Sequence, residues 1–316
     1  MAPRIPYGRL PTERVDPRTR RLDRLSPLAI ARLMNRADRE AVRAVAAAAP
    51  DIARAVALIV ASLGNGGRLI FVGAGTSGRL GVLEAAECPP TFGTPPSLVQ
   101  AVMAGGRGAV FRSVEGAEDD VGAGHARLRR ARSRDVVVGI AASGVTPFVR
   151  AALSAARRRG AATVLVTCNA ETPRDSARVV IALPVGPEVL AGSTRLKAGT
   201  ATKLTLNALT VAAFAQLGKI YGNRMVDLRP RSAKLRARAR RLVAELGDVG
   251  EGEAARLLRQ ARGSAKLAIV MARLHVGASD ARRMLRAASD SLPRLLDGRA
   301  ARRLTRSAAP RRRRRR

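Results

Sequence analysis

The chain has 316 residues, of which 47% are hydrophobic and 2% are aromatic. This length suits one large α/β domain with helical additions. It contains no run of about 18 apolar residues and its first residues lack the apolar core of a secretory signal, so we expect a cytoplasmic protein without a membrane span. Cysteine and histidine occur twice each, without metal-ligand spacing, which argues against a disulfide scaffold, a metal site and a Ser-His-Asp triad.

The formal net charge is +34, and residues 223–316 carry more than half of it, with 27 Lys and Arg against 8 Asp and Glu. The run Arg311–Arg316 could bind nucleic acid or another polyanion through charge alone. Arginine, however, outnumbers lysine 53 to 5, which is typical of a GC-rich genome that places arginine at solvated positions. Aromatic platforms for base stacking are scarce. We therefore expect non-specific polyanion binding at low salt.

The N-terminal region predicts an arm followed by two helices. Residues 1–24 are rich in Pro, Arg and Thr, and we expect them to be extended. Ser26 followed by Pro27 is a typical helix start, and apolar residues then recur at helical spacing. Pro50 marks a second start, and that helix is expected to end in the glycines of residues 64–67.

The central region alternates between short apolar runs and helical patterns, which predicts a doubly wound parallel sheet. The expected strands are Leu69–Val72, Leu98–Met103, Val136–Ala141, Thr163–Thr167 and Val179–Leu183. The expected helices cover residues 78–87, about 117–132, 146–159 and about 195–220.

From Asn223 onward, glycines break the sequence into short helical segments, and the chain beyond Asp297 is expected to be disordered. The fold prediction is therefore an α/β protein with a five-stranded parallel sheet, N-terminal helices and a small C-terminal helical appendage. We divide it into an arm with helices (1–58), a sheet domain (59–222), a helical region (223–298) and a basic tail (299–316).

The glycine-rich sequence GAGTSG, at residues 73–78, lies between the first expected strand and a helix. Such a loop presents backbone N–H groups and a helix N-terminus to an anion. The spacing also matches a dinucleotide loop, but that site needs a carboxylate at the end of the second strand, where the sequence after Met103 reads AGGR. We therefore expect no nicotinamide or flavin cofactor. The hydroxyls of Thr76 and Ser77 suit a terminal phosphate instead.

Two more loops of this kind each precede a helix, AASGVTP at residues 141–147 and GSTR at residues 192–195. One Ser/Thr/Gly turn is most often only a helix cap. Several at the same edge of a sheet predict a ligand, because ligands bind at the carboxyl ends of parallel strands. The ligand class that fits hydroxyls and backbone N–H groups is a sugar phosphate.

These loops resemble those of sugar isomerase (SIS) domains, which bind phosphosugars. Over nearly its whole length the chain is similar to the N-acetylmuramic acid 6-phosphate etherase family, through LPTERVDPRTRRLDRLSP, GAGTSGRLGVLEAAECPPTFG, VEGAEDD, DVVVGIAASGVTP, GSTRLKAGTATKLTLN and GKIYGNRMVDLRP. The ECPPTFG and VEGAEDD stretches are specific to this family. The resemblance implies an SIS-type sheet, a homodimer and a lyase of cell-wall recycling. This lyase cleaves the D-lactyl ether of N-acetylmuramate 6-phosphate to N-acetylglucosamine 6-phosphate and D-lactate.

That reaction needs two carboxyl groups and neither a metal nor a redox cofactor. The open-chain aldehyde at C1 acidifies the C2 hydrogen, so a base can remove it while an acid protonates the departing lactyl oxygen at C3. The resemblance assigns Glu87, in ECPP, as the acid and Glu118, in EGAE, as the base. We expect Glu87 at the end of its helix, because Pro89 and Pro90 follow.

By the same resemblance, the expected substrate-binding residues are Gly75, Thr76, Ser77, Ser143, Gly144, Thr146, Ser193 and Lys197. Lys197 and Lys203 either neutralise the phosphate or are ordinary helix-face lysines. Val145 departs from the family pattern, in which a charged residue is frequent. Two alternatives remain: a phosphosugar-binding regulator like that of glucokinase, which has no need of both glutamates, and a phosphosugar isomerase, which releases no lactate.

Overall fold

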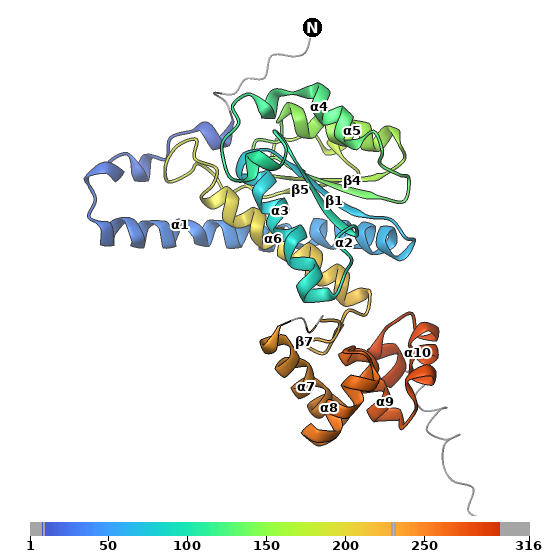
Figure 1. Ribbon diagram of the computed structural model, residues 1–316. Helices are drawn as coiled ribbons and strands as arrows, with labels where there is room; N and C mark the ends of the chain where they lie inside the picture. The colour runs from blue at the N-terminus through green and yellow to red at the C-terminus, as the bar shows by residue number, and fades with distance from the viewer. Residues whose placement is uncertain (1–7, 9, 229, 231, 298–316) are drawn as a thin grey trace, which may run out of the picture. The chain divides into compact units, whose positions relative to one another are not determined.

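The computed structural model describes residues 8, 10–228, 230 and 232–297 (Figure 1). The chain forms two compact units, the first made of Met1–Glu87 and Pro95–Ala213 and the second of Cys88–Thr94 and Phe214–Arg316. The predicted disordered tail lies outside the described residues.

The first unit contains the predicted sheet, with five parallel strands in the order β2-β1-β3-β4-β5. Its strands are β1 (Leu69–Gly73), β2 (Val99–Met103), β3 (Val136–Ile140), β4 (Ala162–Thr167) and β5 (Val179–Ala182). Every residue of β1 and β3 is buried, which explains why these strands are continuous apolar runs. The strand order reverses at β1, so the carboxyl ends of β1 and β3, at the pair Gly73 and Ile140, form the switch point where ligands bind in such sheets.

Helices cover both faces of the sheet (Figure 1). Helices α4 (Val121–Leu128) and α5 (Pro147–Arg158) pack on one face, where Phe148 and Leu153 contact residues of β1, β3 and β4. Helix α2 (Ala49–Gly64) lies against the other face. The doubly wound arrangement predicted from the alternating pattern is confirmed.

The described part of the N-terminal arm, residues 8 and 10–24, is not the extended segment that its composition predicted. It forms short 3-10 turns at Pro11–Glu13, Pro17–Thr19 and Leu22–Arg24. The carboxylate of Asp16 caps the second turn by accepting the Arg18 N–H at 2.9 Å, and it also pairs with the Arg18 guanidinium at 2.7 Å. Helix α1 (Pro27–Ala47) follows, and Ser26 caps it as expected, accepting the Ala29 N–H at 3.3 Å.

Helix α3 (Gly75–Phe92) is longer than predicted, so the expectation that it ends at Glu87 is wrong. Pro89 and Pro90 lie within its last turns; their fixed φ fits a helix, but each lacks the N–H that would bond to the preceding turn, and its ring crowds the carbonyl four residues earlier. The helix stops at Gly93, which has a φ of +66° and donates its N–H to the Pro89 carbonyl at 3.0 Å. This left-handed residue is a typical helix end.

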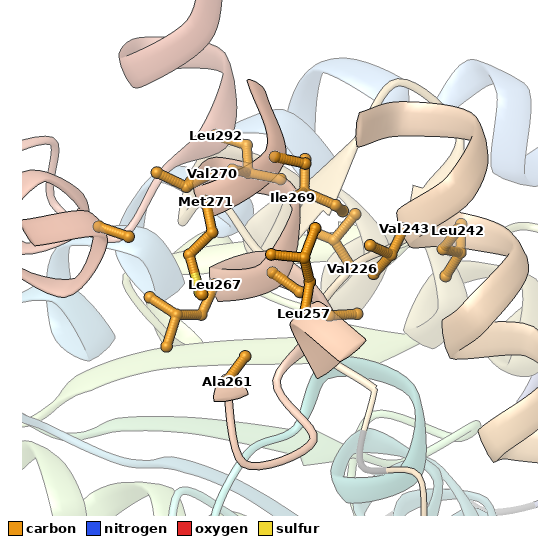
Figure 2. Close-up of a cluster of buried hydrophobic side chains, with 14 of the residues drawn as sticks. Val226, Leu242, Val243, Leu257, Ala261, Leu267, Ile269, Val270, Met271 and Leu292 are labelled. Atoms are coloured by element: carbon orange, nitrogen blue, oxygen red, sulfur yellow. The ribbon is translucent and has the colours of Figure 1, made fainter. Parts of the chain in front are cut away.

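The second unit contains the helices predicted after residue 223 and a small hairpin that was not predicted. The helices are α7 (Ala233–Gly247), α8 (Glu251–Gln260), α9 (Ala265–Leu274) and α10 (Ala278–Ala287); a π-helical turn, η8, covers Pro293–Asp297. The hairpin pairs β6 (Ile220–Tyr221) with β7 (Arg224–Met225). Figure 2 shows the core of this unit, in which Leu267, Ile269, Val270 and Met271 of α9 lie among side chains from α7 and α8.

Lys266 is buried at the start of α9 and is held by several acceptors. Its Nζ donates to Asp227 Oδ2 at 2.6 Å, to the Asp290 carbonyl at 2.8 Å and to the Gly218 carbonyl at 3.1 Å. A buried ammonium group needs such partners, since an unpaired one would be strongly destabilising. This lysine therefore ties the hairpin region and the segment after α10 to the core of the unit.

Across the described ranges, no single helix has the length and apolar character required to span a bilayer; α1 and α2 meet those criteria only when taken together, and a 60° bend separates them.

Candidate functional site

A cavity of about 260 Å³ lies at the carboxyl ends of β1 and β3, in the first unit. Its walls come from the N-terminal arm, the loops after β1 and β3, the turn before α4 and the loop before α6. The lining residues are Leu10, Thr12, Glu13, Ala74, Gly75, Thr76, Ser77, Glu118, Asp119, Ile140, Ala142, Ser143, Thr146, Pro147, Gly192 and Thr194. This is the carboxyl edge of the sheet, where the sequence predicted a ligand.

The first loop supplies Gly75, Thr76 and Ser77 to this cavity. The turn is tight enough to require glycine, since a Cβ on Gly78 would lie 2.7 Å from the Gly73 carbonyl oxygen. Gly75 has a φ of +51° and begins α3, so the first N–H groups of this helix lie beside the cavity. They and the helix dipole favour an anion there.

The second loop contributes Ser143 and Thr146, whose hydroxyl oxygens are 3.5 Å apart. Gly144 is not among the described residues of the lining. It shapes the loop, because its φ is +76° and a Cβ there would lie 2.2 Å from Thr172 Oγ1. Asn169 supports the same loop by donating from Nδ2 to the Ser143 carbonyl at 3.1 Å. Gly144 thus sets the positions of its hydroxyl-bearing neighbours.

The third loop lines the cavity with Gly192 and Thr194, whereas Ser193 is absent from the described lining. Glu188 holds the end of this loop in place. Its carboxylate is fully buried and accepts the N–H groups of Lys197 and Ala198, each at 2.9 Å. Burial raises the pKa of Glu188, and the two backbone N–H bonds and the charge of Lys197 act in the opposite direction.

Neither lysine of α6 (Lys197–Gln216) belongs to the lining that the structure describes. Lys197 is buried, and its Nζ donates to Glu40 Oε2 of α1 at 2.6 Å. Lys203 pairs with the buried carboxylate of Glu84 on α3 at 2.5 Å. The alternatives from the sequence, neutralisation of the phosphate and ordinary helix-face lysines, stay predictions. The two lysines tie α6 to other helices of the first unit.

The structure brings one of the two predicted glutamates to the loops that follow β1 and β3. Glu118 lies in the 3-10 turn Ala117–Asp119, before Asp120 caps α4, and it lines the cavity. Glu87 is exposed on α3 and is not part of the described lining of this cavity within its own chain. The single chain therefore presents Glu118 beside the loops without Glu87.

The N-terminal arm supplies cavity residues that the sequence reasoning missed, Thr12 and Glu13. The Thr12 carbonyl accepts the Gly192 N–H at 3.1 Å, so the arm lies against the third loop. Glu40, the partner of Lys197, also pairs with Arg18 of the arm at 2.8 Å. The sequence offered one indication that Glu13 has a special role, because it is the sole acidic residue among the first fifteen of a basic arm.

The described lining of the cavity carries no lysine or arginine, and its charged side chains are Glu13, Glu118 and Asp119. An anion there must be held by backbone N–H groups, hydroxyls and the start of α3 rather than by a cation. The carboxylates suit neutral parts of a ligand, as hydrogen-bond acceptors or as proton-transfer groups.

Comparison with known proteins agrees with this geometry. Residues 51–157 match the glucokinase regulatory protein N-terminal SIS domain, and residues 113–212 match the SIS domain. The chain is 49% identical over 267 residues to the N-acetylmuramic acid 6-phosphate etherase of Trichormus variabilis, covering 84% of this chain and 87% of that protein. Etherases of the same name from Picosynechococcus sp. (48%, covering 90% and 96%) and Microcystis aeruginosa (47%, covering 88% and 92%) are similarly close.

Proposed function

The chain belongs to the N-acetylmuramic acid 6-phosphate etherase family, and we propose that it cleaves the D-lactyl ether of N-acetylmuramate 6-phosphate. The products are N-acetylglucosamine 6-phosphate and D-lactate, as in the recycling of cell-wall amino sugars. The observation that carries this proposal is the 48% identity to an etherase over 90% of the chain. The cavity at the switch point of the sheet supports it.

We propose that the phosphate binds at the loops after β1 and β3. The N–H groups at the start of α3 and the hydroxyls of Thr76, Ser77, Ser143 and Thr146 would hold it. Gly75 allows close approach of the backbone, while Gly144 and the segment from Ser193 to Lys197 keep the other loops in place. This division fits a cavity whose described lining has no cationic side chain.

The chemistry proposed is an elimination followed by addition of water. Glu118 removes the C2 hydrogen of the open-chain aldehyde, and the electron pair forms a C2–C3 double bond as the C3–O bond breaks. Glu87 donates a proton to the departing oxygen, which leaves as D-lactate. Water then adds across the double bond, with its hydroxyl on C3 and its hydrogen on C2. Acid and base groups of this kind typically contribute about 10²–10⁴-fold each to the rate.

We further propose that the protein works as a homodimer in which the cavity of one chain receives Glu87 from the other. The supporting observation is that Glu87 is exposed and lies outside the described lining of its own cavity. Mixing two inactive variants, Glu87→Gln and Glu118→Gln, tests this, because a mixed dimer would contain one intact site. After subunit exchange we expect about a quarter of wild-type activity, as two-fold symmetry requires. No recovery, with exchange verified, would contradict the shared site.

The role of Glu118 as the base is tested by the substitution Glu118→Gln. The substitution Glu171→Gln, at an exposed residue, is the matched control. We expect D-lactate release to fall by at least about 10²-fold in the first variant and to be unchanged in the second. Binding of N-acetylglucosamine 6-phosphate should change less than about threefold in either, because the phosphate contacts remain. Near-normal turnover by Glu118→Gln would refute its assignment.

We also propose a cytoplasmic location and, as a secondary property, non-specific polyanion binding through the C-terminal arginines. The support for the second is the excess charge of residues 223–316. Binding of this kind should weaken steeply as salt rises. Deletion of Arg311–Arg316 should reduce the affinity for a DNA duplex without changing D-lactate release; unchanged DNA affinity would contradict the proposal.

A further inference from the structure

A second cavity, of about 160 Å³, adjoins the first in the same unit. Ala74, Gly75 and Glu118 line both cavities, so Glu118 lies where they meet. The hydroxyls of the phosphate loops line the first cavity, whereas Arg79 lines the second. In the part of the chain that the structure describes, Arg79 is the one lysine or arginine in the lining of either cavity.

The guanidinium of Arg79 is held in a fixed orientation. It is partly buried on α3, and its Nε donates to the Val110 carbonyl at 2.9 Å while Nη2 donates to the Ala109 carbonyl at 3.0 Å. These bonds occupy one side of the group, and among the described residues Nη1 has no protein acceptor. A planar, permanently charged group oriented in this way is well suited to bind a carboxylate.

The proposed substrate carries two anionic groups, the phosphate on C6 and the carboxylate of the lactyl group on C3. The base that removes the C2 hydrogen must lie beside C2, which is directly bonded to the carbon that carries the lactyl group, so it must adjoin the lactyl site while the phosphate at the far end of the sugar reaches its own site. Glu118 has that position between a cavity with hydroxyls and a cavity with a guanidinium. Resting on the proposed function, we propose that the second cavity binds the lactyl group and that Arg79 pairs with its carboxylate.

Glu115 also lines the second cavity and is exposed. Its charge opposes the binding of a carboxylate there, although water screens exposed charges, so the effect is small. The substitution Glu115→Gln should therefore lower the KM for N-acetylmuramate 6-phosphate by up to about fivefold. The same substitution should leave the affinity for N-acetylglucosamine 6-phosphate unchanged, because that product has no lactyl carboxylate.

The main test is Arg79→Gln, with the exposed Arg112→Gln as a control of equal charge change in the neighbouring segment. For Arg79→Gln we expect the KM for N-acetylmuramate 6-phosphate to rise about 10- to 100-fold, the effect of losing a hydrogen-bonded charge. The Kd for N-acetylglucosamine 6-phosphate should stay within about twofold. Arg112→Gln should change neither value.

Arg79 also donates hydrogen bonds to the carbonyls of residues 109 and 110, so its substitution could weaken binding by disturbing the local structure. A second measurement therefore uses the wild-type protein and changes the ligand instead. An analogue of the substrate with its lactyl carboxylate converted to an amide should bind the wild-type protein at least tenfold more weakly than the substrate. Equal binding of the two would overturn the proposal, and so would an equal loss of affinity for substrate and product in Arg79→Gln. If the wild-type protein releases D-lactate normally, these results overturn the lactyl subsite alone; no D-lactate release at all would overturn the proposed function as well.

Discussion

Glu188 is a carboxylate whose replacement should disturb both stability and phosphosugar binding. It is fully buried, and its two oxygens accept the N–H groups of Lys197 and Ala198 at the start of α6. The first N–H groups of a helix have no partner within the helix itself. Glu188 therefore caps α6 directly behind the loop that carries Thr194 into the cavity.

The substitution Glu188→Gln keeps the size of the side chain but replaces one acceptor with an NH₂ group that faces a backbone N–H. Loss of a hydrogen bond to a charged group costs about 1.5–3 kcal/mol, and a buried unpaired N–H adds about 1–3 kcal/mol. The neutral amide is easier to bury than a carboxylate, which offsets part of this loss. We expect a net destabilisation of about 2–4 kcal/mol, which corresponds to a fall in Tm of about 5–15 °C.

Thermal unfolding followed by circular dichroism measures the stability, and titration with N-acetylglucosamine 6-phosphate measures the affinity. The exposed Glu171→Gln is the control, and both of its values should match those of the wild type. We expect Glu188→Gln to weaken phosphosugar binding as well, because the third loop loses its anchor. A Tm within 1 °C of the wild type, together with an unchanged Kd, would refute the reasoning.

Three further predictions concern acid stability, the arm and the thiols. Burial alone would raise the pKa of Asp135, but hydrogen bonds from the Arg68 side chain and from backbone N–H groups keep it lowered. Its stabilising effect is therefore present above the unfolded pKa of about 3.9 and is lost as pH falls through the folded value. Urea midpoints should show that the destabilisation caused by Asp135→Asn shrinks below about pH 4; a constant difference would contradict this. Glu13→Gln should lower kcat/KM for D-lactate release about tenfold, since its carboxylate lines the cavity, and unchanged kinetics would exclude a substrate contact. Burial raises the pKa of the Cys168 thiol to about 12, and Cys88 is also buried, so a thiol reagent at pH 8 should modify neither until the protein unfolds.

The strands and the glycine-rich loops beside the cavity were predictable because they depend on short stretches of sequence. A buried parallel strand must be apolar throughout, as β1 and β3 are, and a tight turn such as Gly73–Gly78 must contain glycine. The cap at Ser26 is likewise a local interaction. Once the strands are parallel, their carboxyl ends meet at one edge, which brings the first two loops to one cavity.

The roles of the charged side chains were not predictable, because their partners lie far away in the sequence. Lys197 pairs with Glu40 across 157 positions, and Lys203 pairs with Glu84 across 119 positions. No local pattern separates such lysines from a phosphate ligand. The arm that brings Glu13 to the cavity is likewise held by a distant partner, through the ion pair of Arg18 with Glu40. Burial alone would raise the pKa of Glu40, but hydrogen bonds from Arg18 and Lys197 keep it lowered.

The end of α3 was mispredicted for a different reason. Two consecutive prolines usually mark the end of a helix, yet here they occupy its last turns and Gly93 ends it. A Cβ on Gly93 would lie 2.1 Å from the Asp227 carbonyl oxygen, so this stop depends on a close approach within the second unit. Tertiary packing therefore decides where this helix ends.

The most direct test of the account is to incubate the protein with N-acetylmuramate 6-phosphate in deuterium oxide. D-lactate is measured enzymatically, and the sugar product by mass spectrometry and NMR. We predict that D-lactate appears in equal amount to N-acetylglucosamine 6-phosphate and that the product carries deuterium at C2, as elimination followed by water addition requires. Absence of D-lactate would contradict the proposed function, and D-lactate release without deuterium at C2 would contradict the mechanism assigned to Glu118.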